Sequence, residues 1–396
     1  MRKGALSTAC AVAGIIALAG CGSSSSGGGS GSGGSGSGGS NGGNSAAATG
    51  ASTASGGGGS TAASGGAIDG KGAKVGFILP DRQSSNRWIS SDPEALKARC
   101  KADNLNCDIQ NANNSAQQMT TIATTMMNNG VKVLGLVNLD SASAAQIEKT
   151  AKSKGIYTID YDRLTLGGSA SLYVSFDNTK VGELQGKTLT QCSQVKGKSA
   201  VKYVDLNGAP TDNNATLFKQ GYDSVLKKQK GWTKLADQSV PDWDNQKAGI
   251  IFTSMLQKNP NMNAVMVAND GMAGSVITAL QKQGLAGKVA VSGQDATVEG
   301  LQRIMDGTQC FTIYKPSKLE AFPAVDAAAQ LANGQAPKTT QKTKDTQTGR
   351  MVPSILATPI AITKANVARP INDGYTPKST TCKGSYAAKC TAAGVK

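Results

Sequence analysis

From residue 74 onward, short runs of apolar and β-branched residues alternate with longer stretches in which apolar residues recur at helical spacing. This alternation is typical of the strand–helix–strand units that build parallel sheets. The first series predicts strands at residues 74–79, 106–110, 133–137 and 157–160, with helices at residues 87–103, 116–129 and 144–154. It therefore predicts a first α/β lobe that is complete near residue 178.

A second series of the same kind follows. It predicts a helix at residues 180–192 and strands at residues 200–205, 235–240, 264–268, 289–292 and 310–314. The second lobe already has its expected strands and helices when two further segments follow, an apolar helical stretch at residues 319–333 and a segment at 354–362. We therefore expect the chain to return to the first lobe and back. Open α/β sheets bind ligands beyond the carboxyl ends of their strands, so two such lobes facing each other would close on a ligand between them.

The pattern thus predicts an α/β protein of two doubly wound parallel-sheet lobes joined by hinge strands. We assign residues 74–178 plus about 316–340 to the N-terminal lobe. Residues 179–315 plus about 341–396 form the C-terminal lobe and tail in this prediction.

The first 73 residues show a different pattern. Arg2 and Lys3 precede a short apolar run that ends in Ala19 and Gly20 before Cys21, which predicts a signal peptide at 1–20. The run is too short to span a bilayer. We expect Cys21 to be lipidated, although a plain signal peptide also fits, and the Gly/Ser-rich residues 21–73 to form a disordered linker. The protein is then exported and anchored to the outer face of the cell membrane by its lipid.

Composition narrows the function. The chain has no histidine, which excludes Ser/His/Asp and Cys/His catalysis and the commonest zinc ligand sets. The formal charge of +15 is spread over scattered lysines, and aromatic residues make up only 4% of the chain. A nucleic-acid surface would need clustered basic and aromatic side chains. We therefore expect no nucleic acid, no cofactor, no metal and no enzymatic activity.

Six cysteines follow Cys21, an even number in a chain predicted to be exported. No CxxC pair occurs, so disulfides are favoured over a metal site. Six cysteines allow fifteen pairings, and free buried thiols are the alternative. Local closure favours Cys100 with Cys107 and Cys382 with Cys390, which leaves Cys192 with Cys310.

Polar and aromatic residues follow nearly every predicted strand, at the ends where a ligand would bind. Arg87 and Trp88 follow the first strand. The aspartates among these residues are accompanied by arginine, lysine and asparagine, and the tryptophans would add flat apolar surfaces. The candidate ligand-binding residues are Arg87, Trp88, Asp162, Arg163, Asn214, Trp243, Asn269, Asp295 and Lys315, with Asp212 and Asp270 as secondary candidates.

A neutral polyol explains this chemistry. Each sugar hydroxyl donates and accepts a hydrogen bond, so carboxylates beside arginine, lysine or asparagine suit it. The tryptophans would cover the C–H faces of a pyranose. The alternative for Asp177, Asp212 and Asn269 is a helix cap, since each directly follows a strand. We expect Asp270 to be a helix cap or a group that supports the site. The alternative for Arg87 and Trp88 is that the arginine lies on the surface and the tryptophan packs in the core. Tyr161 and Phe176 should be core residues.

Several of these residues stand in motifs that resemble the bacterial D-xylose-binding proteins of ABC transporters, within the type I periplasmic binding protein family. The resemblance runs from about residue 74 to 373. It implies that the sugar contacts fall on the primary candidates other than Trp88, and that Trp88 is a second wall of the site. The six mature cysteines, the linker and the tail at 376–396 depart from the Gram-negative members. The motifs are Asn86-Arg87-Trp88, Tyr161-Asp162-Arg163, Ser175-Phe176-Asp177-Asn178, Asp212-Asn213-Asn214-Ala215, Ser292-Gly293-Gln294-Asp295-Ala296 and Tyr314-Lys315-Pro316.

The resemblance implies a monomeric binding protein that captures D-xylose or a related monosaccharide and delivers it to an ABC permease in the membrane. A sensor that presents ribose, arabinose or glucose to a membrane receptor or kinase is the alternative. A glycosidase would need a carboxyl group of raised pKa beside a water path. Here each acid is expected to be matched to a basic or amide side chain.

Overall fold

A computed structural model of the protein describes residues 66–396. The predicted signal peptide, Cys21 and the linker up to residue 65 lie outside the described residues. The linker was expected to run to residue 73, but residues 66–73 pack on the first lobe: the Ile68 and Gly70 amides donate to the carboxylate and the carbonyl of Asp103, at 3.0 and 2.7 Å. In the described part of the chain the folded region therefore includes residues 66–73.

The N-terminal lobe is built on a seven-stranded sheet with the strand order β11-β12-β5-β4-β3-β1-β2. Its strands pair in parallel except for β11, which pairs antiparallel with β12. The strands are β1 (Lys74–Leu79), β2 (Asn106–Asn111), β3 (Val133–Leu136), β4 (Tyr157–Tyr161), β5 (Leu172–Phe176), β11 (Gln341–Lys344) and β12 (Met351–Ala357).

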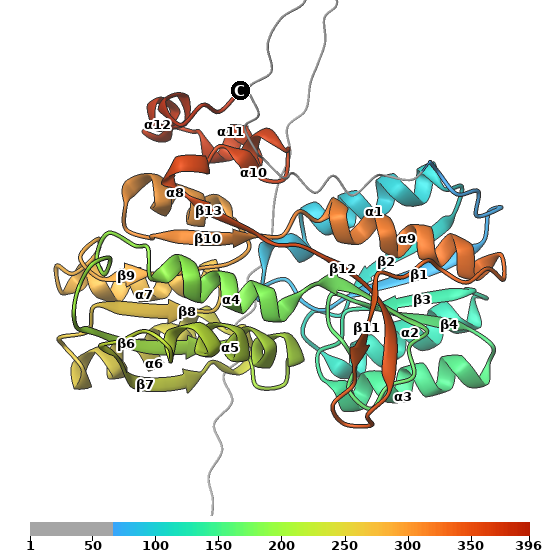
Figure 1. The fold of residues 1–396 in the computed structure, drawn as a ribbon. Coiled ribbons are helices and arrows are strands. Elements are labelled where there is room, and N and C mark those ends of the chain that lie inside the picture. Colours follow the sequence, from blue (N-terminus) through green and yellow to red (C-terminus); the bar gives the residue numbers. More distant parts are fainter. Residues whose placement is uncertain (1–65) are drawn as a thin grey trace, which may run out of the picture. The chain divides into compact units, whose positions relative to one another are not determined.

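Helices cover both faces of this sheet (Figure 1). Successive β1 side chains point to opposite faces: Val75 and Phe77 pack with α1 (Ser91–Ala102) and α9 (Lys318–Ala332), whereas Ile78 packs with α2 (Ala116–Asn128) and α3 (Ser141–Ser153). Burial on both faces explains why these strands read as continuous apolar runs.

The C-terminal lobe has a four-stranded parallel sheet in the order β7-β6-β8-β9. Beside it, β10 pairs antiparallel with β13. The strands are β6 (Val201–Asn207), β7 (Trp232–Ser239), β8 (Ala264–Val267), β9 (Ala290–Val291), β10 (Phe311–Tyr314) and β13 (Ile360–Thr363). The helices are α4 (Asn178–Leu189), α5 (Asn213–Leu226), α6 (Asn245–Lys258), α7 (Asp270–Lys282) and α8 (Val298–Asp306), with the short η2 (Pro241–Trp243).

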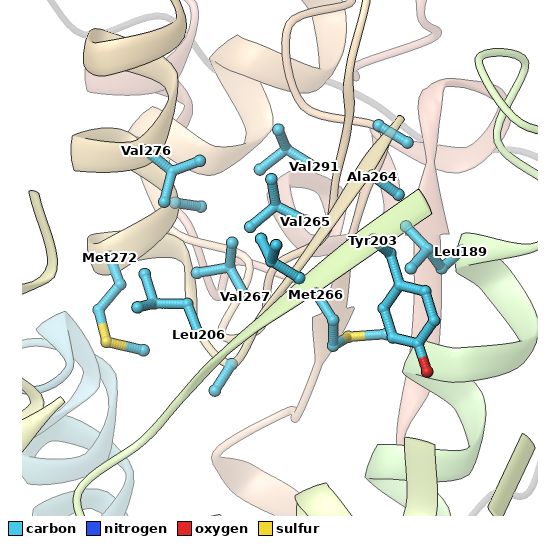
Figure 2. Packing of buried hydrophobic residues seen from close by; sticks show 14 of the residues in the cluster. Leu189, Tyr203, Leu206, Ala264, Val265, Met266, Val267, Met272, Val276 and Val291 are labelled. Atoms are coloured by element: carbon cyan, nitrogen blue, oxygen red, sulfur yellow. The ribbon is translucent and has the colours of Figure 1, made fainter. Parts of the chain in front are cut away.

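The core of this lobe lies on both faces of its sheet. Figure 2 shows Val267 of β8 on the side of Met272 and Val276 of α7, and Met266 on the side of Leu189 of α4. All five side chains are fully buried. This double packing fixes the strand ends from which the site residues project.

The chain crosses between the lobes three times: after β5, after β10 and after β12. The predicted assignment of residues 341–396 to the C-terminal lobe is therefore wrong for β11 and β12. The β12 strand pairs in parallel with β5, and β11 folds back on β12. The Gln-Lys-Thr-Lys sequence of β11 is polar because this edge strand is exposed, so it carries no apolar pattern to predict it.

The other predicted elements agree with the structure apart from their ends, with two exceptions. The predicted helix at 87–103 is divided into η1 (Asn86–Trp88) and α1, with Pro93 in the first turn of α1, where a proline is tolerated. The strand β5 was not predicted, because its five residues run directly into the Asp177 cap of α4.

Three disulfides join the six cysteines in the pairs favoured by local closure. Cys100–Cys107 links α1 to β2, and Cys192–Cys310 ties the segment after α4 to the start of β10. Cys382–Cys390 lies in the C-terminal tail, which forms η3 (Lys364–Asn366), α10 (Arg369–Asn372), α11 (Lys378–Thr381) and α12 (Tyr386–Ala392). Among residues 66–396, no helix is long and apolar enough to cross a membrane.

Candidate functional site: a polar cavity between the lobes

Loops at the carboxyl ends of strands from both lobes line a small cavity. The structure brings all nine primary candidates to it, and it also brings Asp212. Asp270 does not line this cavity. The lining residues are Ser84, Ser85, Arg87, Trp88, Asp162, Arg163, Asp212, Asn214, Phe218, Trp243, Asn269, Gln294, Asp295 and Lys315.

Arg87 is fixed by three carboxylates in the N-terminal lobe. Its Nε and one terminal nitrogen donate to Asp92, and further bonds run to Asp162 and Glu320, at 2.8 and 2.5 Å. Burial disfavours its charge, but these carboxylates hold the pKa of Arg87 well above its usual value. The pKa of Glu320 is raised well above its usual value by burial, which the charge of Arg87 opposes.

Asp162 is the acceptor at the centre of the site. It follows β4 with a φ of +62°, a conformation that is costly outside glycine and is retained where the surroundings fix it. The Asn214 amide donates to both its carbonyl and its carboxylate, at 3.0 and 3.1 Å. Burial acts to raise the pKa of Asp162, but the charges of Lys315, Arg87 and Arg163 hold it below its usual value. Asp162 is therefore ionised at neutral pH.

Arg163 lines the cavity and has one side-chain nitrogen without a hydrogen bond to the described residues. One of its terminal nitrogens donates to the Asn138 carbonyl at 3.0 Å, and the Asn138 amide donates back to the Arg163 carbonyl at 3.1 Å. Its Nε lies 3.0 Å from Asp212 Oδ2, but is buried and makes no hydrogen bond with any residue that the structure describes. A ligand oxygen could accept from this N–H.

Two tryptophans supply flat apolar surface. Trp88 Nε1 donates to Ser84 at 3.2 Å, and the Arg87 guanidinium lies 4.4 Å from the centre of the Trp88 ring. Trp243 Nε1 donates to Asp212 at 3.1 Å. Because these polar edges are paired with protein groups, the orientation of each ring is fixed, and the Arg87 guanidinium already covers one face of Trp88.

Two asparagines connect the lobes. Asn214 of α5 bonds to Asp162 of the N-terminal lobe, and Asn269 Nδ2 donates to the Ser84 carbonyl at 2.8 Å. Asn269 also caps α7, as Asp212 caps α5 and Asp177 caps α4. Asp212 and Asn269 are thus helix caps that also line the cavity, whereas Asp177 is a cap that does not.

Asp295 and Gln294 present unused acceptors. Asp295 Oδ1 and Gln294 Oε1 are buried and accept no hydrogen bond from residues 66–396. The Lys315 ammonium lies 3.7 Å from Asp295 Oδ1 and 3.8 Å from Asp162 Oδ2. Unsatisfied buried acceptors are costly, so this arrangement suits a ligand that donates hydrogen bonds.

Asp270 supports the fold of the C-terminal lobe. Its carboxylate accepts from the Thr297 amide, Gln309 and Thr312, at 3.0, 2.7 and 2.9 Å. It therefore ties the start of α7 to α8 and β10. Burial raises the pKa of Asp270 to about 6, which the charge of Arg303 partly opposes.

Sequence reasoning missed the partners that fix Arg87, namely Asp92 and Glu320, and four of the cavity residues, Ser84, Ser85, Phe218 and Gln294. The sequence did contain one sign of this role, because Glu320 is an acid within the apolar helix α9. It is fully buried there, and an acid is rarely buried without a partner. Tyr161 is a core residue, as expected, and donates to Asp92 at 2.6 Å.

The charges that line the cavity balance. Three side chains are basic and three are acidic: Arg87, Arg163, Lys315, Asp162, Asp212 and Asp295. Such a cavity suits an uncharged ligand with several hydroxyl groups, because each hydroxyl can donate to a carboxylate and accept from a cation. In the described part of the chain, no group of three or more histidine, cysteine or acidic residues is placed to hold a metal ion.

The fold agrees with the comparisons to known proteins. Residues 75–336 match the periplasmic binding protein domain family, and the chain belongs to that family. The D-xylose-binding periplasmic protein of Escherichia coli is 36% identical over 318 residues, which are 79% of this chain and 94% of that protein. The protein of the same name from Haemophilus influenzae is 34% identical, over 78% of this chain and 92% of its own length.

A solved structure shows the same architecture. An ABC transporter solute-binding protein from Clostridium phytofermentans with bound β-D-glucose matches with a TM-score of 0.70 and 25% identity. The match covers 78% of this chain and 99% of that one. The prediction of two parallel-sheet α/β lobes of the periplasmic-binding-protein type is thereby confirmed.

Proposed function

We propose that the protein is an exported binding protein of an ABC importer that captures D-xylose between its lobes and delivers it to a membrane permease. The observation that carries the proposal is the charge-balanced cavity with a buried donor on Arg163 and buried acceptors on Gln294 and Asp295 left unsatisfied. Membership of the periplasmic binding protein family and the 36% identity to a D-xylose-binding protein support it.

In the proposed complex, hydroxyl groups of the sugar donate to Asp295 and accept from Arg163 Nε. Trp88 and Trp243 cover the C–H faces of the ring. The cavity is small, which favours a monosaccharide over a longer sugar. D-glucose is the second candidate, because the relative from Clostridium phytofermentans holds it.

The acids are placed for binding rather than for hydrolysis. Asp162 is held ionised by Lys315, Arg87 and Arg163, so it cannot serve as the general acid of a glycosidase. The pKa of Asp212 is raised by burial, but its oxygens cap α5 and accept from Trp243. We therefore propose a binding protein without enzymatic activity, and aryl xylosides should be stable in its presence.

Lipid anchoring through Cys21 and a monomeric state are part of the same proposal. The sequence around Cys21 supports the anchor, and the linker after it would leave the lobes free to reach a permease. Cys21 and most of the linker lie outside the described part of the chain.

A thermal-shift experiment on the mature protein tests the proposed ligand. D-xylose should raise the melting temperature, because a ligand that binds the folded state stabilises it by about 2.7 kcal/mol at a hundred times Kd. D-xylonate is the matched control: it carries a carboxylate, and the balanced charges of the cavity provide no counter-ion for it. A shift with D-ribose or D-galactose but none with D-xylose or D-glucose would overturn the assignment and leave the fold intact.

A further inference from the structure

Asp295 and the residue after it have an unusual backbone conformation. Their φ angles are +97° for Asp295 and +48° for Ala296, and neither residue is glycine. Such conformations are costly for residues with a Cβ and persist where several neighbouring groups fix them. The groups that fix this turn therefore determine where the Asp295 carboxylate points.

Two different segments hold the four backbone polar groups of this turn. On the amide side, Asp295 donates to the Ile313 carbonyl at 2.8 Å, and Ala296 donates to the Thr312 hydroxyl at 3.1 Å, both in β10. On the carbonyl side, the Tyr375 hydroxyl donates to Asp295 at 3.0 Å. The Thr376 hydroxyl donates to Ala296 at 2.9 Å.

Tyr375 and Thr376 belong to the C-terminal segment, residues 373–396, which lies beyond the residues that match the family. Figure 1 shows its helices α11 and α12 beside α8. The Gln302 side chain of α8 donates to the Thr381 carbonyl at 3.1 Å, and the Tyr386 hydroxyl donates to Asp306 at 2.7 Å. The Cys382–Cys390 disulfide closes the segment on itself.

We infer that the C-terminal segment positions Asp295 for ligand binding, through the hydroxyl groups of Tyr375 and Thr376. Without these two donors the carbonyls of the turn lose their partners, and the turn can relax toward ordinary φ values. The Cα–Cβ bond of Asp295 then swings away from the cavity. This inference rests on the proposed sugar site, and it makes Tyr375 and Thr376 positioning residues that do not line the cavity.

The variants Tyr375→Phe and Thr376→Val remove the two hydroxyls with almost no change in volume. Each should weaken D-xylose binding in a calorimetric titration by about 3- to 10-fold, the loss expected for one hydrogen bond. Tyr386→Phe is the matched control, because it removes a tyrosine hydroxyl from the same segment but leaves the turn untouched. It should keep the wild-type affinity even where its melting temperature falls.

A double-mutant cycle separates positioning from general loosening of the protein. In an Asp295→Ala background, Tyr375→Phe should change the remaining affinity by less than about 2-fold, since the carboxylate that it positions is absent. A loss in that background equal to the loss in the wild type would overturn the inference.

Hydrogen exchange tests the inference without any sugar. The amides of Asp295 and Ala296 should exchange at least about 5-fold faster in the Tyr375→Phe, Thr376→Val double variant than in the wild type or in Tyr386→Phe, because a local opening replaces the fixed turn. Unchanged exchange would overturn the inference. Faster exchange in a protein that binds no sugar would support the positioning role while refuting the proposed function.

Discussion

Asp295 Oδ1 lies 3.7 Å from the Lys315 ammonium, and neither this lysine nor any other residue among 66–396 donates a hydrogen bond to that oxygen. The two residues follow neighbouring strands, β9 and β10. The carboxylate is thus attracted by a cation but has an acceptor position left for a ligand hydroxyl. A sugar hydroxyl that donates to Asp295 would satisfy this buried acceptor.

Asp295→Ala and Asp270→Ala should therefore have different effects. Asp295→Ala should weaken D-xylose binding by about 10-fold or more, because hydrogen bonds to charged groups contribute about 1.5–3 kcal/mol and Lys315 loses a partner. Asp270→Ala should mainly lower the melting temperature, because Asp270 holds Thr297, Gln309 and Thr312. Calorimetric titration and thermal unfolding of both variants check this. Equal losses of affinity would show that the boundary of the site is misplaced.

Arg163→Ala should also reduce affinity strongly while the protein stays folded. Arg163 lines the cavity with an Nε that makes no hydrogen bond within residues 66–396, and loss of the side chain leaves Asp212 without its cation. Lys219→Ala is a suitable control for removal of a charge elsewhere in the protein, since Lys219 pairs with acids on β6 and β7 outside the cavity. The account is contradicted if Arg163→Ala binds D-xylose like the wild type.

The raised pKa of Asp270 predicts a dependence of stability on pH. Burial raises this pKa to about 6 in the folded protein, against 3.8 for the ordinary side chain. Between about pH 4 and 6 the folded state therefore holds more protons than the unfolded state, so this residue's contribution to the free energy of unfolding falls as pH rises, by about 3 kcal/mol in total.

Urea denaturation of the wild type and Asp270→Asn at pH 4 and pH 7 measures this effect. The substitution should cost more stability at pH 4 than at pH 7, because the neutral carboxyl group contributes most below its folded-state pKa. A cost that is the same at both values of pH would show that Asp270 titrates normally in the folded protein.

The Cys192–Cys310 disulfide should stabilise the protein more than Cys100–Cys107. The first closes a loop of 118 residues and the second a loop of 7. The loss of chain entropy in the unfolded state corresponds to about 5 kcal/mol for the long loop and about 2.5 kcal/mol for the short one. Urea denaturation of the two double alanine variants measures both. A larger loss for the short loop would contradict this order.

The strands and most helices could be predicted because burial on both faces of a parallel sheet leaves clear apolar runs. The hairpin of β11 and β12 could not be predicted, because β11 is a polar edge strand whose place is set only by its pairing with β12. Among the site residues, Asp162 and Asp295 follow predicted strands and so were found. The Glu320 that fixes Arg87 is distant in sequence by 233 residues, and only the fold shows that α9 returns beside η1.

The most direct test of the central claim is a calorimetric titration of the mature protein with D-xylose, alongside D-glucose, D-ribose, L-arabinose and D-galactose. We predict one site per chain, D-xylose as the tightest ligand, and loss of the signal in Asp295→Ala. Binding of D-xylose that is absent or weaker than that of D-ribose or D-galactose, or that is unchanged in Asp295→Ala, would contradict the account.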